Sequence, residues 1–230
     1  MEAISREYWL AHSGHKASAD LSAIYAEYAD ALGREALEVT LDAHRSASDD
    51  DSKRSARQLL EWQAESQSGK AVAALEEREI AWENAAVVHL KDGVDVPYSR
   101  VSIEIANLQN RAERSALDVE RAALVARELA PIRSERLQRE RDFMEELDIA
   151  SSYNATFEAL SGISLSELAT QCRAFLRDTE SMWTDVHGEL VKRSLGIKPS
   201  EATRADALAL MRAPQFDEFF PARAMEGVCG

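Results

Sequence analysis

The stretch SLSELATQCRAFLRDTESMWTDVHGELVKRSLG, from Ser164 to Gly196, constrains the fold more than any other part of the chain. Its apolar and small side chains recur at spacings of three and four, at Leu165, Leu168, Cys172, Phe175, Leu176, Thr179, Met182, Trp183, Val186 and Leu190. This period predicts one long amphipathic helix. Ser164 and Glu167 form a capping box at its start, and Gly196 favours its end. Because burying each large apolar side chain stabilises a fold by about 1.5–3 kcal/mol, we expect this stripe, Cys172 included, to be buried against other helices.

The rest of the chain repeats the helical pattern. Nine Gly and five Pro are few for 230 residues, whereas a sheet protein needs many turns. Further helices are predicted at Glu2–Ser13, from Asp20 through Leu37, from the acidic run Asp49-Asp50-Asp51 with an interruption at Gly69, at Asn110–Leu147 with a kink or break at Pro131, and at Tyr153–Leu160. We therefore expect an all-α, multi-helix bundle of long amphipathic helices in a single helical domain, 1–230.

One segment has the pattern of a β-hairpin. Val88 and Leu90 alternate with polar residues, Asp92-Gly93 is a strong turn signal, and Val94 and Val96 follow at strand spacing. We expect one small hairpin near residues 87–97. Alternation at Val101, Ile103 and Ile105 then suggests an extended approach or a short strand before the helix at Asn110.

Charge and targeting signals narrow the class of protein. The formal net charge is −14, which argues against nucleic acid and against an anionic membrane surface as partners. The N-terminus carries charges and no apolar segment of a signal peptide. Two cysteines, Cys172 and Cys229, make no disulfide framework. A cytoplasmic protein fits this pattern.

No metal or cofactor site is predicted. None of the five histidines begins a His-Glu-x-x-His sequence, and none stands three residues after a Glu. His12 and His15 flank Gly14 and would need further ligands from elsewhere. We interpret Asp49-Asp50-Asp51 as a helix start, because acidic side chains complement the positive end of the helix dipole.

No catalytic residue is predicted either. Gly-rich phosphate loops and Gly-x-Ser-x-Gly elbows are missing from the sequence. The clusters Glu76-Glu77-Glu79 and Glu145-Glu146-Asp148, and the arginine-rich segment from Asn110, are interpreted as solvated helix faces. Trp9, Trp62, Trp82 and Trp183 are expected to belong to the core.

Several segments in order carry a family resemblance. They are DLSAIYAEYADALGREAL, then VPYSRVSIEIANLQNRAERSALDVERAAL, then YNATFEALSGISLSELATQCRAFLRDTESMW, and last MRAPQFDEFFPA. From about Glu7 to Ala222 this order resembles the N-terminal half of the thimet oligopeptidase and oligoendopeptidase F family of zinc peptidases. The resemblance implies an almost entirely helical, two-lobed fold around a channel for an extended peptide. It also implies that zinc and its His-Glu-x-x-His ligands belong to the later half, so that no catalytic residue is carried over to this chain.

Three hypotheses follow. The last residues, from Ala222, look like an unfinished helix, and we expect an N-terminal part of a longer peptidase-like protein whose partners are the missing catalytic lobe and the parent's peptide substrate. In the alternative, the chain is a standalone acidic helical protein-interaction module. The third hypothesis is a ligand-binding or metal-storage bundle.

Overall fold

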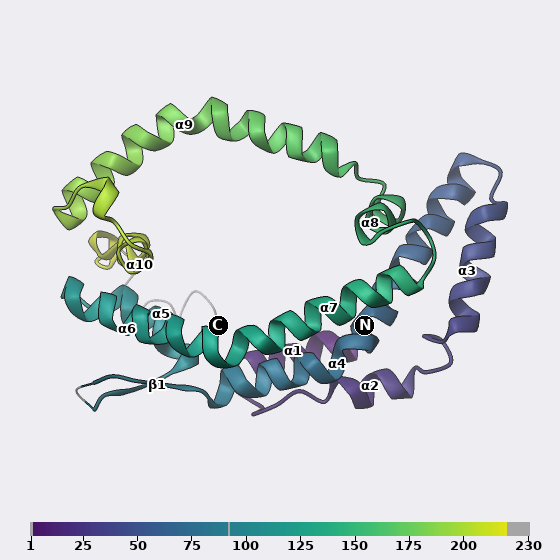
Figure 1. The fold of residues 1–230 in the computed structure, drawn as a ribbon, viewed down its shortest axis with the longest axis horizontal. Coiled ribbons are helices and arrows are strands. Elements are labelled where there is room, and N and C mark those ends of the chain that lie inside the picture. The colour runs from purple at the N-terminus through teal and green to yellow at the C-terminus, as the bar shows by residue number, and fades with distance from the viewer. Residues whose placement is uncertain (1, 92, 220–230) are drawn as a thin grey trace. The chain divides into compact units, whose positions relative to one another are not determined.

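The computed structural model describes residues 2–91 and 93–219. The all-α architecture with one small hairpin is confirmed (Figure 1). The chain divides into two compact units, Met1–Ala85 with Val125–Phe175, and Ala86–Leu124 with Leu176–Gly230. That residues 1–230 form a single helical domain therefore stays a prediction. The turn residue Asp92, the segment from Ala222 and Cys229 lie outside the described residues.

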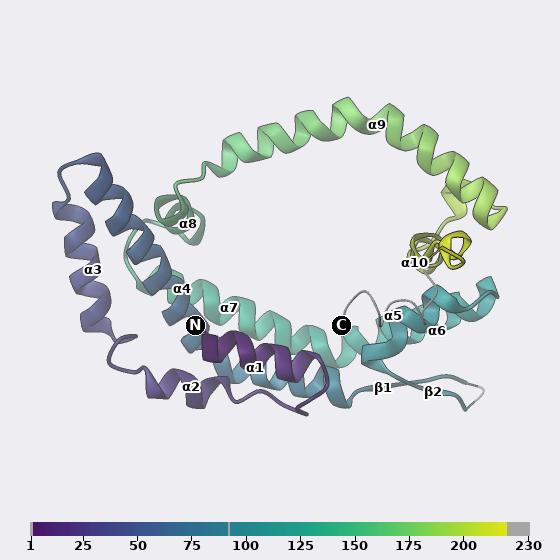
Figure 2. The same ribbon diagram turned by 180° about the vertical axis from the view of Figure 1, so that it is seen from behind.

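The first unit is built around the long helix α4. It contains α1 (Glu2–His12), α2 (Leu21–Glu27), α3 (Arg34–Ser46), α4 (Asp50–Ala85), the π-helical turn η1 (Val125–Leu129), α7 (Ala130–Glu146), α8 (Tyr153–Ser161) and the first part of α9 (Leu165–Leu195). Helix α4 lies beside α7 and packs on α1, α2, α3 and α8 (Figures 1 and 2). Two apolar clusters result, one where α1 and α2 meet α4, and one where α3, α7 and α8 meet α4.

The helix predicted from Asp20 through Leu37 is in fact two helices, α2 and α3, with a turn between them. Side chains of α4 donate to the backbone carbonyl oxygens of this turn, among them that of Gly33, which also accepts from the Leu37 N–H at 3.3 Å. Gln63 donates to the Ala31 carbonyl at 3.0 Å, Gln67 to Gly33 at 3.2 Å, and Lys70 to Leu32 at 3.1 Å. These donors, distant in sequence, stabilise a break that local periodicity does not reveal.

Helix α4 continues through Gly69, so the predicted interruption there is wrong. A Cβ at this position would overlap the hydroxyl of Tyr25 in α2. Gly69 therefore allows α2 to approach closely. Helix propensity alone would disfavour glycine at this position, relative to alanine, by about 1 kcal/mol.

A kink or break is predicted at Pro131, but helical turns continue through it without a break, and the irregularity is a π-helical turn just before it. The five-residue π-helix Val125–Leu129 separates α6 from α7, and Pro131 occupies the first turn of α7. Proline lacks a backbone N–H and is tolerated in the first turn, where no intrahelical acceptor is required.

The second unit combines the hairpin with shorter helices. It contains β1 (Val87–His89), β2 (Asp95–Pro97), α5 (Tyr98–Asn107), α6 (Arg111–Leu124), the second part of α9, the turn η2 (Pro199–Glu201), α10 (Arg204–Arg212) and η3 (Pro214–Phe216). The strands pair antiparallel with Val88 opposite Val96. The extended segment expected at Val101–Ile105 is wrong, because α5 buries Val101 and Ile105 four residues apart and exposes Ile103.

Candidate functional sites

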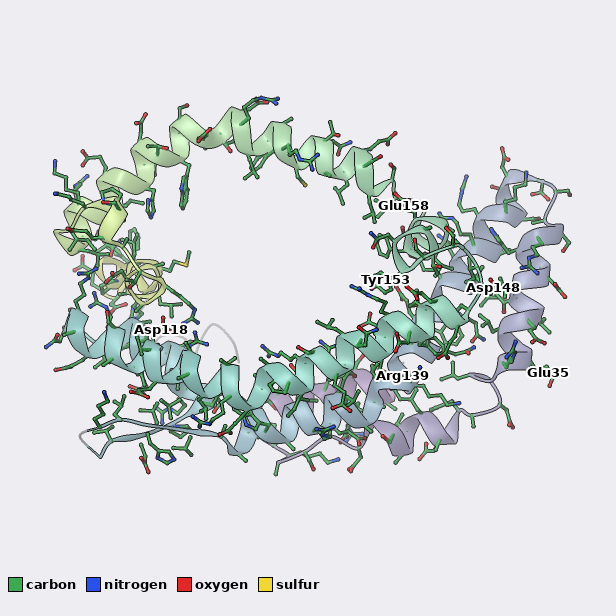
Figure 3. The ribbon with its side chains drawn as sticks, in the orientation of Figure 1. Glu35, Asp118, Arg139, Asp148, Tyr153 and Glu158 are labelled. Carbon is green, nitrogen blue, oxygen red and sulfur yellow. The ribbon has the colours of Figure 1, made fainter. Side chains whose placement is uncertain are left out.

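Helix α9 has the ends that its sequence predicts. Glu158 of α8, labelled in Figure 3, accepts a hydrogen bond from the Leu165 backbone N–H at 2.7 Å. Ser164 accepts from the Glu167 N–H at 3.3 Å, which is one half of the predicted capping box. Gly196 ends the helix with a φ of +68°, a left-handed conformation that glycine adopts without strain.

The apolar face of α9 is exposed. In the second unit we define the α9 stripe as Leu176, Met182, Trp183, Val186 and Leu190, all of which are exposed. Leu176 is 65% exposed and Trp183 61%. Within this helix, every residue of which is described, Val191 alone is buried. The expectation that the stripe forms core is therefore wrong for this chain.

Cys172 and three of the four tryptophans were also expected in the core and are exposed instead. Cys172 is exposed rather than part of the core, as are Trp9, Trp62 and Trp183. Trp82 is partly buried, and its indole N–H donates to Glu128 at 2.9 Å. A helical period indicates which residues share a face, but it does not indicate whether another element covers that face.

An arginine-lined pocket occupies the second unit. Its volume is about 700 Å³, and residues from the end of α5, the start of α6, the last turns of α9 and the α10–η3 segment line it. The charged lining residues are Arg111, Arg114, Arg193, Arg212 and Asp217. Arg212 donates to Asp217 at 2.6 and 2.8 Å. We call this cavity the arginine pocket.

Asp206 of α10 connects two of these arginines. It is fully buried and accepts from Arg111 at 3.1 Å and from Arg114 at 3.1 Å. Asp206 and Thr203 also form a capping box at the start of α10. Burial disfavours the carboxylate, but the hydrogen bonds from Arg111, Thr203 and Arg114 outweigh it and lower the pKa of Asp206 to about 2. This network of ion pairs thus attaches α10 to α6.

Sequence reasoning missed this cluster. Arg114 was expected on a solvated face, yet only 5% of it is exposed. Its partners Leu108, Gln109 and Asp206 lie on both sides of it in the sequence, Asp206 as far as 92 residues away. The alternation of Arg with Glu and Asp around it is also typical of exposed ion pairs, so the local pattern carried no signal of burial. Asp118 of the same helix, labelled in Figure 3, fits that pattern in part, since it pairs with Arg121 at 2.9 Å and also with Arg204.

A carboxylate cluster lies in the first unit. Tyr8 donates a short hydrogen bond to Glu76, and Glu79 accepts from Arg133 at 2.6 Å and from Arg136 at 3.2 Å. The expectation of a solvated face at Glu76 and Glu79 is therefore wrong, because α7 supplies cations to them. Burial raises the pKa of Glu76, although the Tyr8 hydrogen bond and Arg136 oppose it. Burial and then the hydrogen bond to Glu76 raise the pKa of Tyr8.

This cluster is small and fully committed to its own ion pairs. The cavity beside it measures about 160 Å³, less than the 300 Å³ or more that is usual for a small-molecule site. By contrast, Glu145, Glu146 and Asp148 are exposed as expected. Figure 3 labels further residues of the first unit, namely Glu35, Arg139, Asp148 and Tyr153.

A groove under the hairpin is mostly apolar. Its volume is about 630 Å³, and its apolar lining includes Leu90, Val94, Val96, Leu117 and Val119. Among the described residues, Glu104, Glu113 and Glu120 line the same groove together with one cation, Lys91. The groove therefore combines apolar walls with a net negative rim.

The histidines are not gathered into a metal site. His12 stacks on Tyr8 with ring centroids 6.0 Å apart, and His15 contacts Trp9 at 5.1 Å. Over residues 2–91 and 93–219 there is no group of three or more His, Cys, Asp or Glu side chains suited to hold a metal ion. Asp49 instead accepts from the Ser52 N–H at 2.9 Å at the start of α4, as the helix-start interpretation predicts.

Comparisons with models of protein families, with curated proteins and with solved structures find no match to this chain. In the described part of the chain, no helix is long and apolar enough to cross a membrane.

Proposed function

We propose that this chain is the N-terminal helical lobe of a zinc-dependent oligopeptidase-like protein. In this proposal it forms one wall of a channel that holds an extended peptide, and the protein is cytoplasmic. A second lobe with a His-Glu-x-x-His motif binds the zinc ion and activates water for hydrolysis. This chain contains no such motif, so it contributes binding and not chemistry.

The observation that supports the proposal most is the α9 stripe. Five large apolar side chains follow one another along the helix and remain exposed. Contiguous exposed apolar surface on a folded protein usually marks a binding site. A helix face of this kind offers apolar contacts at regular intervals to an extended peptide, and the order of the four family-like sequence segments supports a peptidase scaffold.

Peptide binding to the isolated chain tests the proposal. We would measure fluorescence anisotropy of a labelled, unstructured peptide rich in Leu and Phe. Val186→Asp places a charge within the stripe and should weaken binding by roughly tenfold, which corresponds to about 1.4 kcal/mol. Val39→Asp is the matched control, because Val39 is also an exposed valine on a helix, α3. Equal weakening by both variants, or no binding at all, would overturn the proposal.

The hairpin groove favours a second candidate function, a standalone acidic protein-interaction module. Apolar walls with a rim of Glu104, Glu113 and Glu120 suit an amphipathic helix that carries basic residues beside its apolar face. Sedimentation velocity separates the two candidates. A monodisperse, cooperatively melting protein that binds a basic amphipathic peptide in this groove, and no extended apolar peptide on α9, supports the module.

A further inference from the structure

The arginine pocket has a surplus of positive charge in an otherwise acidic protein. Arg111 and Arg114 share the carboxylate of Asp206, and Arg212 pairs with Asp217. Arg193, the remaining arginine of the pocket, forms no ion pair within residues 2–91 and 93–219. Glu201 also lies near Arg111. Even with it counted, four guanidinium groups face three carboxylates, whereas the whole chain carries a net charge of −14.

Arg114 presents an unsatisfied donor at this pocket. Its two terminal nitrogens donate to the carbonyl oxygens of Leu108 and Gln109, each at 2.9 Å, and to Asp206 at 3.1 Å. Its Nε is buried and has no hydrogen-bond partner among the described residues. A buried, charged N–H without an acceptor costs free energy, so this position calls for an acceptor.

Neutral polar groups complete the lining. Asn107, Ser194 and Gln215 face the same space as the arginines. Guanidinium groups match the geometry of carboxylate and phosphate oxygens, and their charge-assisted hydrogen bonds are stronger than those between neutral groups. The volume of about 700 Å³ accommodates a small molecule.

We propose that the arginine pocket binds a small oxyanion, a carboxylate or phosphate group, between Arg193 of α9 and Arg114 of α6. The oxyanion accepts from Arg114 Nε and balances the charge of Arg193. Leu190 of the α9 stripe also lines this pocket, but the site requires no zinc, no second lobe and no bound peptide.

Calorimetric titration of the full chain with inorganic phosphate and with succinate tests this site. Sodium chloride at matched ionic strength serves as the reference, since it screens charges equally and lacks the oxyanion geometry. Arg193→Gln should weaken binding roughly tenfold to a hundredfold, as expected for the loss of a charge-assisted contact. Arg193 is exposed and forms no ion pair in the described part of the chain, so the variant should keep the melting temperature of the parent.

Arg173→Gln is the matched control. Arg173 is another exposed arginine of α9 and is not among the residues that line the pocket, and its loss changes the net charge by the same amount. Binding that Arg193→Gln weakens and Arg173→Gln preserves supports the site. Tighter binding of phosphate assigns a phosphoryl ligand, and tighter binding of succinate assigns a carboxylate. Titrations indistinguishable from chloride, or equal losses in the two variants, overturn the proposal and leave the peptide test on α9 unaffected.

Discussion

Helices α4 and α9 are the two longest helices and have opposite environments. Helix α4 has 36 residues and buries nine of them, among them the polar or small Gln63, Ser66, Gln67 and Ser68. Helix α9 has 31 residues and buries only Val191, although its apolar stripe is the more regular of the two. The difference shows that the number of neighbouring elements, and not the regularity of a stripe, determines burial.

Small residues explain how α4 becomes central. Ala64, Gly69 and Ala73 let neighbouring helices approach its backbone, and Tyr25 lies directly over Gly69. Its glutamines remain buried because they satisfy carbonyl groups of the α2–α3 turn. Helix α9 instead presents large side chains, which suit the surface of a partner better than the interior of its own unit.

The largest expected effect comes from truncating one leucine on each helix. Leu60 of α4 is 1% exposed, and Leu60→Ala should lower the free energy of unfolding by about 2–5 kcal/mol because it leaves a cavity. Leu176→Ala on α9 should change it by less than about 0.5 kcal/mol, as is usual for exposed sites. Urea unfolding monitored by circular dichroism measures both. Comparable losses would mean that the α9 stripe is covered in solution.

The second prediction concerns the second unit, where Asp206 of α10 forms ion pairs with Arg111 and Arg114 of α6. It measures how much the charge of Asp206 stabilises the fold. The pKa of Asp206 lies at about 2 in the folded chain, below its ordinary value of 3.8. Its stabilising contribution is therefore present above pH 3.8 and is lost as the pH falls toward 2. By linkage this contribution amounts to about 2 kcal/mol. Asp206→Asn should lower stability at pH 7 by at least this amount, since it also leaves Arg114 buried without its counter-charge.

The control is a comparison of Asp206→Asn with the parent at low pH, where the parent's Asp206 loses its charge. Near pH 2 the parent has lost most of the Asp206 contribution, so the stabilities of variant and parent should converge. Unfolding free energies from urea titrations at pH 7, 4 and 2.5 provide the measurement. A difference that is constant across this range would show that Asp206 acts through packing and not through its charge.

The smallest effects should have opposite signs at two helical glycines. Gly188→Ala on α9 meets nothing closer than Pro199 Cγ at 3.8 Å, so the higher helix propensity of alanine should stabilise the chain by about 0.5–1 kcal/mol. Gly69→Ala on α4 would drive a methyl group into the Tyr25 hydroxyl, and overpacking should destabilise the chain by about 1–3 kcal/mol. Melting temperatures by calorimetry give both signs. Stabilisation by both substitutions would show that Tyr25 moves aside easily.

Much of the helical architecture could be predicted, because local signals specify it. The cap of α4 at Asp49 and the stop of α9 at Gly196 each depend on residues within one turn. The hairpin near 87–97 likewise follows from alternation and turn residues. The turn between α2 and α3 could not be predicted, since the groups that satisfy it are on α4.

The arginine pocket was equally inaccessible to sequence reasoning. Arg114 and Asp206 are 92 residues apart, and nothing in the immediate sequence of either residue indicates a buried pair. The exposure of Trp183 and Leu176 could not be predicted either. An apolar stripe has the same sequence whether its partner belongs to the same unit or to another molecule.

The donors for the carbonyl groups at positions 31–33 come from 32 to 38 residues further along the chain. A peptide containing only α2, α3 and their connection would lack these side-chain donors, although the Gly33 carbonyl would keep the Leu37 N–H. The turn is thus stabilised by donors from a helix that follows it in the sequence. Unwinding of α4 between Gln63 and Lys70 would therefore remove these side-chain donors from the turn between α2 and α3 at the same time.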